Sequence, residues 1–215
     1  ATIAALRAAV EAAGGPGNVL GLVYELVQER TGLVLPADFL TALGALRSEL
    51  DLPLIAVETT THTYRSGKGP FLSTAVGLVP DVLTWWGGGQ TGYVHCAARW
   101  FIGSPLTLVS TWDGDELSLI RQHHQLRAAR ALDVAGASAA LDRALGWALG
   151  SVSSAGLGAY RVIDAGAMAA SLARSLAERG IAVRRFPNQH LGIIPALDQI
   201  EAAAHALGAA LREVA

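Results

Sequence analysis

The chain has 215 residues, enough for one large domain or for a domain with a small appendage. It is 52% hydrophobic and 16% charged with a formal net charge of −2, which excludes disorder, and its scattered arginines disfavour a nucleic-acid-binding surface. Its one cysteine, Cys96, excludes an internal disulfide framework and favours a reducing, cytoplasmic setting, and no segment has the apolar length of a membrane span.

The first part of the chain alternates between helical and strand patterns. An amphipathic helix is predicted at 1–13, and apolar residues at helical spacing predict further helices at 36–50, 115–133 and 138–149. Short apolar runs predict buried strands at 19–24, 53–57, 80–85 and 92–97. Alternating strands and helices indicate βαβ units and a mostly parallel sheet, and strands without polar alternation indicate a sheet covered on both faces.

The composition changes after residue 150. Residues 151–158 are predicted to form a Ser/Gly linker, followed by a strand at 159–163 and a helix that Asp164 caps and Gly180 ends. Two short strands near 182–186 and 190–194 and a last helix at 197–211 complete the chain. The sequence therefore predicts an α/β large domain at 1–150 and a small α+β domain at 151–215.

Five stretches of the chain resemble, in the same order, motifs of one enzyme family. Glu25 to Gln28, followed by Gly32, Val34 and Pro36, resembles a Glu-Pro-Val-Gln-Gly motif, and Leu54 to Glu58 with Arg65 to Lys68 resembles Asp-Glu-Val-Gln…Arg-Thr-Gly-Lys. Val79 to Thr84 resembles the strand before a catalytic lysine, Ser110 to Trp112 with Gly114 resembles Ser-Thr-Trp-Gly-Gly-Asn, and Asn188 to Pro195 resembles a small-domain Asn…Leu-Arg-Ile…Pro stretch.

The family is the class III aminotransferases of the ornithine, GABA and lysine 6-aminotransferase type, which depend on pyridoxal phosphate (PLP). The resemblance implies the C-terminal portion of such an enzyme: a partial fold-type-I large domain, a mostly parallel sheet with flanking helices, and a small C-terminal α+β domain. It also implies active sites shared across a dimer. The family's N-terminal portion, with its phosphate loop and several sheet strands, has no counterpart, so we expect an open apolar sheet edge that invites pairing with another chain.

The resemblance implies that three residues needed for the chemistry are replaced in this chain. The position of the Schiff-base lysine is Gly87, and the chain's single lysine, Lys68, matches a different family position. The aspartate that pairs with the pyridine nitrogen falls on Val57, and the arginine that grips the substrate carboxylate falls on Gly192. Without the imine, the electron sink and the carboxylate clamp, no catalytic residue and no resident cofactor is expected.

A few residues could retain a role in a residual site. Thr111 matches a threonine that contacts the cofactor phosphate of the opposite subunit. The carboxylates of Asp113, Asp115 and Glu116 would repel a phosphate, however, so Asp113-Gly114-Asp115 is better explained as a solvated helix-capping turn. Glu25, Gln28 and Thr60, which takes the place of a glutamine that flanks the ring, could line a residual pocket or serve only local hydrogen bonds.

Other features of the sequence have simpler explanations. The Gly-rich loop at 87–92 lacks the ending of a P-loop and leads into a strand, so it is interpreted as a flexible connection. The six histidines show no metal-ligand spacing, although His62, in a run of threonines, could belong to a repurposed acid–base site. Trp85, Trp86 and Trp112 could fill the former pocket or anchor an interface.

The leading hypothesis from the sequence is a non-catalytic, cytoplasmic aminotransferase-like subunit that scaffolds, assembles or regulates a biosynthetic complex. It would form a homo- or hetero-oligomer, the latter with a chain that supplies the missing N-terminal half, and it would bind neither nucleic acid nor membrane. One alternative is half of a split class III enzyme that uses PLP only with its partner chain. Another is a PLP-free binding module or a repurposed enzyme.

Overall fold

The computed structural model describes residues 2–105, 107, 115–149 and 153–214. Its internal contacts divide the chain into two units of interleaved sequence. Unit 1 comprises Ala1–Leu26, Leu35–Thr59 and Ser73–His124, and unit 2 comprises Val27–Val34, Thr60–Leu72 and Gln125–Ala215. The domain boundary predicted at residue 150 falls outside the described residues and stays a prediction.

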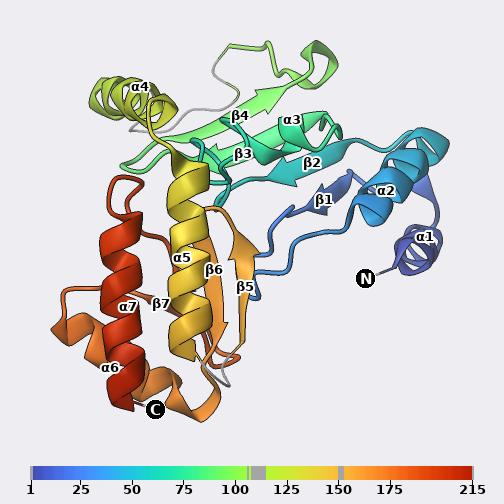
Figure 1. Ribbon diagram of the computed structural model, residues 1–215. Coiled ribbons are helices and arrows are strands. Elements are labelled where there is room, and N and C mark those ends of the chain that lie inside the picture. The colour runs from blue at the N-terminus through green and yellow to red at the C-terminus, as the bar shows by residue number, and fades with distance from the viewer. Residues whose placement is uncertain (1, 106, 108–114, 150–152, 215) are drawn as a thin grey trace. The chain divides into compact units, whose positions relative to one another are not determined.

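Unit 1 contains a four-stranded sheet in the order β1-β2-β3-β4 (Figure 1). Its strands are β1 (Leu22–Tyr24), β2 (Leu54–Val57), β3 (Val82–Trp86) and β4 (Gly92–Cys96). The first three are parallel and β4 is antiparallel to β3, so the predicted mostly parallel sheet is confirmed for this unit. The other elements are α1 (Ile3–Ala12), η1 (Pro16–Asn18), α2 (Ala37–Leu50) and η2 (Ala98–Trp100), while α3 (Leu72–Ala75) and α4 (Glu116–Arg130) each belong partly to both units.

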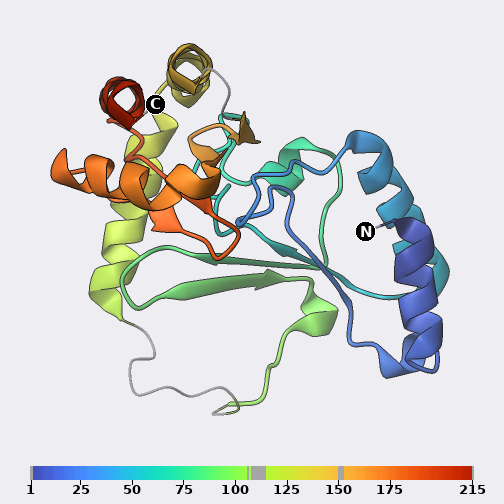
Figure 2. The same cartoon turned by 90° about the horizontal axis from the view of Figure 1, so that it is seen from below.

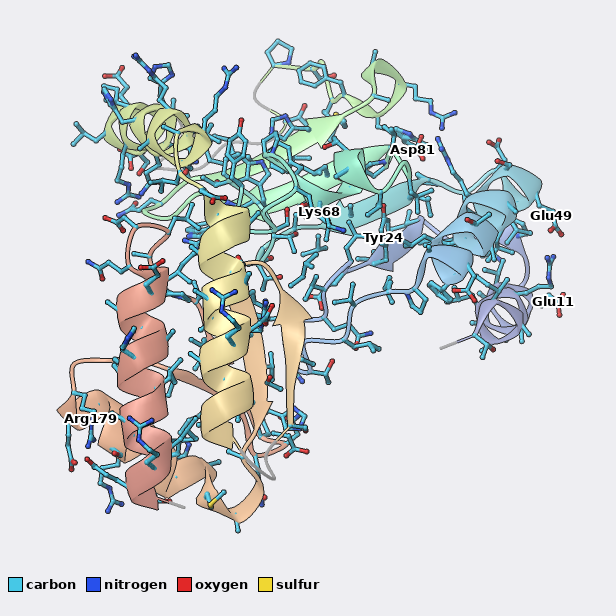
Figure 3. The ribbon with its side chains drawn as sticks, in the orientation of Figure 1. Glu11, Tyr24, Glu49, Lys68, Asp81 and Arg179 are labelled. Atoms are coloured by element: carbon cyan, nitrogen blue, oxygen red, sulfur yellow. The ribbon has the colours of Figure 1, made fainter. Side chains whose placement is uncertain are left out.

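A buried carboxylate joins the starts of β2 and β3. Asp81, which is labelled in Figure 3, is 4% exposed. It accepts hydrogen bonds from the Leu54 N–H at 3.0 Å, from Arg47 of α2 at 2.8 Å and from Arg99 at 2.7 Å. Burial alone would raise the pKa of Asp81, but these hydrogen bonds and charges lower it below its usual value. Asp81 is therefore ionised in the folded chain, and its carboxylate connects the beginnings of two neighbouring strands.

The two faces of this sheet differ in burial. On one face six side chains are buried, namely Leu22, Tyr24, Leu54, Ala56, Leu83 and Trp85. On the other face no side chain is buried, and Val23 and Val94 are 66% and 67% exposed. The prediction that both faces are covered is therefore wrong for the described chain, because an apolar run indicates what a strand can bury and not what lies over it.

Unit 2 contains an antiparallel sheet in the order β5-β6-β8-β7. Its strands are β5 (Ser153–Leu157), β6 (Tyr160–Asp164), β7 (Arg184–Arg185) and β8 (His190–Ile193). Its helices are α5 (Val134–Leu149), η3 (Gly166–Met168), α6 (Ala169–Glu178) and α7 (Ile200–Val214). Helices α5 and α7 lie side by side, seen end-on in Figure 2, and form one core with β6, β8 and α6 through Leu141, Leu145, Ile163, Leu172, Leu191 and Leu207.

Two local predictions in unit 2 are wrong. Residues 153–157 of the predicted linker form β5, which pairs with β6 through a two-residue turn at Gly158, whose φ is +64°. Asp164 ends β6 and does not cap a helix, since α6 begins at Ala169 after a 3₁₀ turn, with no side-chain cap. Gly180, by contrast, follows the α6 C-cap with a φ of +75°, the left-handed conformation expected of a helix-ending glycine.

Candidate functional site

Gly87 lies directly after β3, at the position that the motifs match to the family's lysine. A Cβ atom added to Gly87 would lie 2.6 Å from Tyr93 Cε2 and 2.6 Å from Gln122 Oε1. Real Cβ atoms do not approach other heavy atoms this closely, so any side chain at this position requires both neighbours to move. The space in which a lysine would begin is therefore occupied.

An aromatic stack holds Tyr93 in this place. The Tyr93 and Trp85 rings are parallel within 13° with centroids 4.2 Å apart, and His95 stacks on Trp85 at 6.2 Å. Trp85 is 6% exposed, and burial raises the pKa of the Tyr93 hydroxyl. Trp86, the next residue, lies on the opposite face and is half exposed, so the predicted tryptophan cluster is divided by strand alternation, and Trp112 lies outside the described residues.

Val57 ends β2, where the motifs place the aspartate that serves the pyridine nitrogen. It pairs with Thr84 of β3 and is partly buried, so the strand presents hydrocarbon here. The next residue, Glu58, is fully buried, accepts a hydrogen bond from the Ser73 N–H at 2.8 Å and donates its own N–H to the Thr84 carbonyl. The carboxylate nearest in sequence to Val57, that of Glu58, thus binds the backbone at the start of α3.

The sequence analysis missed a set of buried polar groups at the carboxyl ends of β1 and β2. Tyr24, Glu58 and Ser73 are 8%, 0% and 0% exposed. The pKa of Tyr24 is raised by burial and, next, by the Glu58 charge. Tyr24 Oη and Ser73 Oγ have no hydrogen-bond partner among the described residues. Only Glu58 stood out in the sequence, as part of a motif, because a tyrosine and a serine in apolar segments carry no signal of burial.

Gly192 of β8 occupies the position matched to the family's arginine. A Cβ here would lie 2.9 Å from Phe186 Cε2 and 3.2 Å from the Tyr160 hydroxyl. Tyr160 is 2% exposed and donates its hydroxyl hydrogen to the Glu29 carbonyl. The Phe186 ring and the Tyr160 hydroxyl therefore close the position.

The remaining candidates use their polar atoms locally where the structure describes them. Thr60 donates to the Val27 carbonyl at 3.4 Å, and the Gln28 side-chain oxygen accepts from Thr31 at 3.0 Å. Glu25 is partly buried in unit 1, and Thr111 lies outside the described residues. The residual-pocket and phosphate roles of these residues stay predictions.

The loop at 60–72 contains a second buried polar group. His62 is 8% exposed, its Nδ1 lies 2.6 Å from Thr63 Oγ1, and burial, followed by the charge of Arg65, lowers its pKa to about 4. Thr63 and Tyr64 have φ values of +54° and +63°, a left-handed conformation that is strained for a β-branched residue such as threonine. Arg65 donates to the Pro195 carbonyl at 3.1 Å, and burial lowers its pKa. His62 is thus a neutral imidazole at pH 7.

Among the described residues, no three His, Cys, Asp or Glu side chains gather in an arrangement that could hold a metal ion. None of the helices that the structure describes is long and apolar enough to cross a membrane.

The residues at the matched positions do not fit PLP. Position 87 offers no amine and has no room for one without rearrangement, position 57 offers no carboxylate, and position 192 is closed by Phe186 and Tyr160. No reaction step through this cofactor can therefore be assigned to residues of the chain. The match of these positions to the family's roles rests on the motifs and stays a prediction.

Comparison with known proteins places the chain by fold. No protein-family model and no curated protein matches it. Among solved structures it matches lysine aminotransferase from M. tuberculosis in the internal aldimine form, with a TM-score of 0.81 at 23% identity over 99% of this chain and 53% of that one. It also matches an amine transaminase from an uncultivated Pseudomonas species in the PLP-bound form (TM-score 0.82, 21% identity, 99% and 55% covered) and ornithine δ-aminotransferase of Plasmodium falciparum (0.79, 17%, 99% and 60%).

The chain spans little more than half the length of the structures it matches. At these identities the likeness concerns the fold alone. The chain therefore has the α/β fold of the corresponding part of PLP-dependent aminotransferases.

Proposed function

We propose that this chain is a non-catalytic aminotransferase-like subunit with a scaffolding, assembly or regulatory role in a biosynthetic complex. The observation that carries the proposal is Gly87, where the fold's lysine is expected and where Tyr93 and Gln122 occupy the space of a side chain. A Schiff base requires an amine at the reacting carbon, and glycine has none.

Two other positions support the proposal independently. Val57 cannot keep a pyridine nitrogen protonated, and Gly192 cannot hold a substrate carboxylate through two hydrogen bonds. Val57 is partly buried beside Thr84 of β3, and a Cβ added to Gly192 would meet Phe186 and Tyr160. As a subunit of a complex, the chain would act in the cytoplasm, the compartment that its lone cysteine favours.

The proposal is tested by reduction of the purified chain with borohydride after incubation with PLP. Because Lys68 is the single lysine, mass spectrometry of the parent chain and of Lys68→Arg separates a lysine adduct from one on the terminal amine. We expect no stoichiometric pyridoxyl-lysine and no transaminase turnover with lysine, ornithine or GABA. A stoichiometric adduct on Lys68, or turnover by the chain alone, would overturn the proposal.

A second candidate is one half of a split class III aminotransferase. It is favoured by the coverage of the matched structures, which lies between 53% and 60% of their length. In this candidate the catalytic lysine comes from a partner chain. This candidate requires turnover by the mixture of the two chains and by neither chain alone. A scaffold would contribute no catalytic residue, so the partner's activity would depend on assembly alone.

A further inference from the structure

Two buried hydroxyl groups in unit 1 have no hydrogen-bond partner among the described residues. They are Tyr24 Oη, at the end of β1, and Ser73 Oγ, in α3. Tyr24 is 8% exposed and Ser73 is 0% exposed, so bulk solvent satisfies neither group. A hydroxyl can both donate and accept hydrogen bonds, and buried polar groups in native proteins nearly always bond to protein or to ordered water. Both hydroxyls therefore require a partner that the described residues do not supply.

The strand register brings Tyr24 close to Glu58. Tyr24 pairs with Ala56 of β2, and side chains two residues apart in a strand lie on the same face. The Glu58 N–H donates to the Thr84 carbonyl at 2.9 Å, which continues the pairing of β2 with β3 by one residue. Glu58 is 0% exposed and thus lies on the buried face, diagonal to Tyr24. The Glu58 charge is, after burial, the second cause of the raised pKa of Tyr24, as expected of close neighbours.

Ser73 contacts the same carboxylate. Its N–H donates to Glu58 Oε1 at 2.8 Å, so the residue that carries the second unpartnered hydroxyl lies directly against Glu58. The hydroxyls of Tyr24 and Ser73 do not bond each other, since neither has a partner among the described residues. One small molecule that bonds both hydroxyls beside the carboxylate would satisfy both groups.

The chemistry of the three groups favours water as this molecule. A water molecule can donate to a carboxylate and bond two hydroxyls, which gives the about three hydrogen bonds typical of a buried water. A metal ion is disfavoured, because no three His, Cys, Asp or Glu side chains of the described chain gather in an arrangement that could hold one. All three residues are at most 8% exposed, which is the setting of an internal solvent site.

We propose that Tyr24, Glu58 and Ser73 bind one internal water molecule, which bridges the two hydroxyls and the carboxylate. This water connects the end of β1 with the end of β2 and with the start of α3. The inference goes beyond the proposed function and does not depend on it, because it involves neither PLP nor a partner chain.

The direct test is a crystal structure of the 215-residue chain at a resolution that shows ordered water. The expected result is one density peak within hydrogen-bond distance, about 2.7 to 3.2 Å, of both Tyr24 Oη and Ser73 Oγ. Three outcomes would overturn the inference. These are a direct hydrogen bond from either hydroxyl to another protein group, a peak with the short and numerous oxygen contacts of a metal ion, or no peak at this place.

Unfolding of variants tests the same site in solution. Tyr24→Phe and Ser73→Ala each remove one hydroxyl with little change of shape. Tyr93→Phe is the matched control, because Tyr93 lies in β4 of the same sheet and is partly exposed. A hydroxyl bonded to water contributes to stability, so each site variant should lower the folding equilibrium constant about fivefold, as urea unfolding measures. Tyr93→Phe should leave this constant within about twofold of the parent.

An unpartnered hydroxyl gives the opposite sign. Its removal relieves a buried polar group that bonds nothing, so an unchanged or raised folding constant in Tyr24→Phe would contradict the bound water. The double variant tests whether one water serves both hydroxyls. If it does, the second deletion should lower the constant less than it does alone, whereas two losses that simply multiply would show two independent hydroxyls and refute the bridge.

Discussion

Replacing Asp81 with alanine should lower the free energy of unfolding by about 3 kcal/mol. The largest contribution to this loss comes from the Leu54 N–H. Leu54 is fully buried, and its N–H would lose its side-chain acceptor at a cost of about 1 to 3 kcal/mol. Arg47 is about one third exposed, so its lost ion pair adds about 1 kcal/mol, and Arg99, at 56% exposed, adds less.

Asparagine at position 81 separates the two contributions. It keeps an oxygen for the Leu54 N–H and removes the charge, so the expected loss is about 1 to 2 kcal/mol, smaller than that of alanine. Urea unfolding followed by tryptophan fluorescence and circular dichroism at pH 7 measures both losses. Equal losses for the two variants, or an alanine variant within 0.5 kcal/mol of the parent, would refute the reasoning.

The pH dependence of this difference follows from the lowered pKa of Asp81. A carboxylate with a folded-state pKa below its unfolded value contributes its full stabilisation above the unfolded pKa of about 3.9 and loses it as the pH falls through the folded pKa. The advantage of the parent over Asp81→Asn should therefore be constant between pH 5 and 7 and shrink below about pH 4. An advantage that grows on acidification would contradict the assigned ion pairs.

Three further predictions concern the packed glycines and the buried histidine. Gly87→Ala should destabilise unit 1 by about 1 to 3 kcal/mol because its Cβ meets Tyr93, and Gly87→Lys should show no PLP absorbance, as urea unfolding and spectroscopy would measure. Gly192→Ala should cost a similar amount because its Cβ meets the Phe186 ring, whereas no change in the unfolding midpoint would show that the ring shifts freely. The pKa of His62 is lowered to about 4, so stability should be full above pH 6.5 and fall by about 2 to 3 kcal/mol towards pH 4, and His62→Gln should flatten this profile.

Much of the fold could be predicted from local sequence patterns. Each apolar run predicted as a strand in unit 1 overlaps a strand, and the helix predicted at 36–50 is α2 within one residue. Strand β5 was missed because Ser153 to Gly156 have the composition of a linker, and their strand conformation depends on pairing with β6. That pairing is a tertiary contact, and the strand propensity of the individual residues does not predict it.

The candidate site was less predictable for a related reason. The motifs predict Gly87, Val57 and Gly192 as the positions of the family's lysine, aspartate and arginine, and this assignment stays a prediction. They could not reveal that Gln122, far along the chain, packs against Gly87, since spatial contact between distant residues leaves no periodic signal. Nor could they reveal that Val23 and Val94 are exposed, because a buried strand and an exposed apolar strand can have the same sequence.

The packing at positions 87 and 192 opposes the introduction of a lysine or an arginine at either position. At both positions a neighbouring ring lies within 3 Å of where a Cβ would be, so a lysine or an arginine must first displace Tyr93 or Phe186. Tyr93 is in turn held by its stack on Trp85, and moving it would expose the buried indole. Each introduced side chain would therefore weaken the core that surrounds it, at about 1 to 3 kcal/mol per overpacked position.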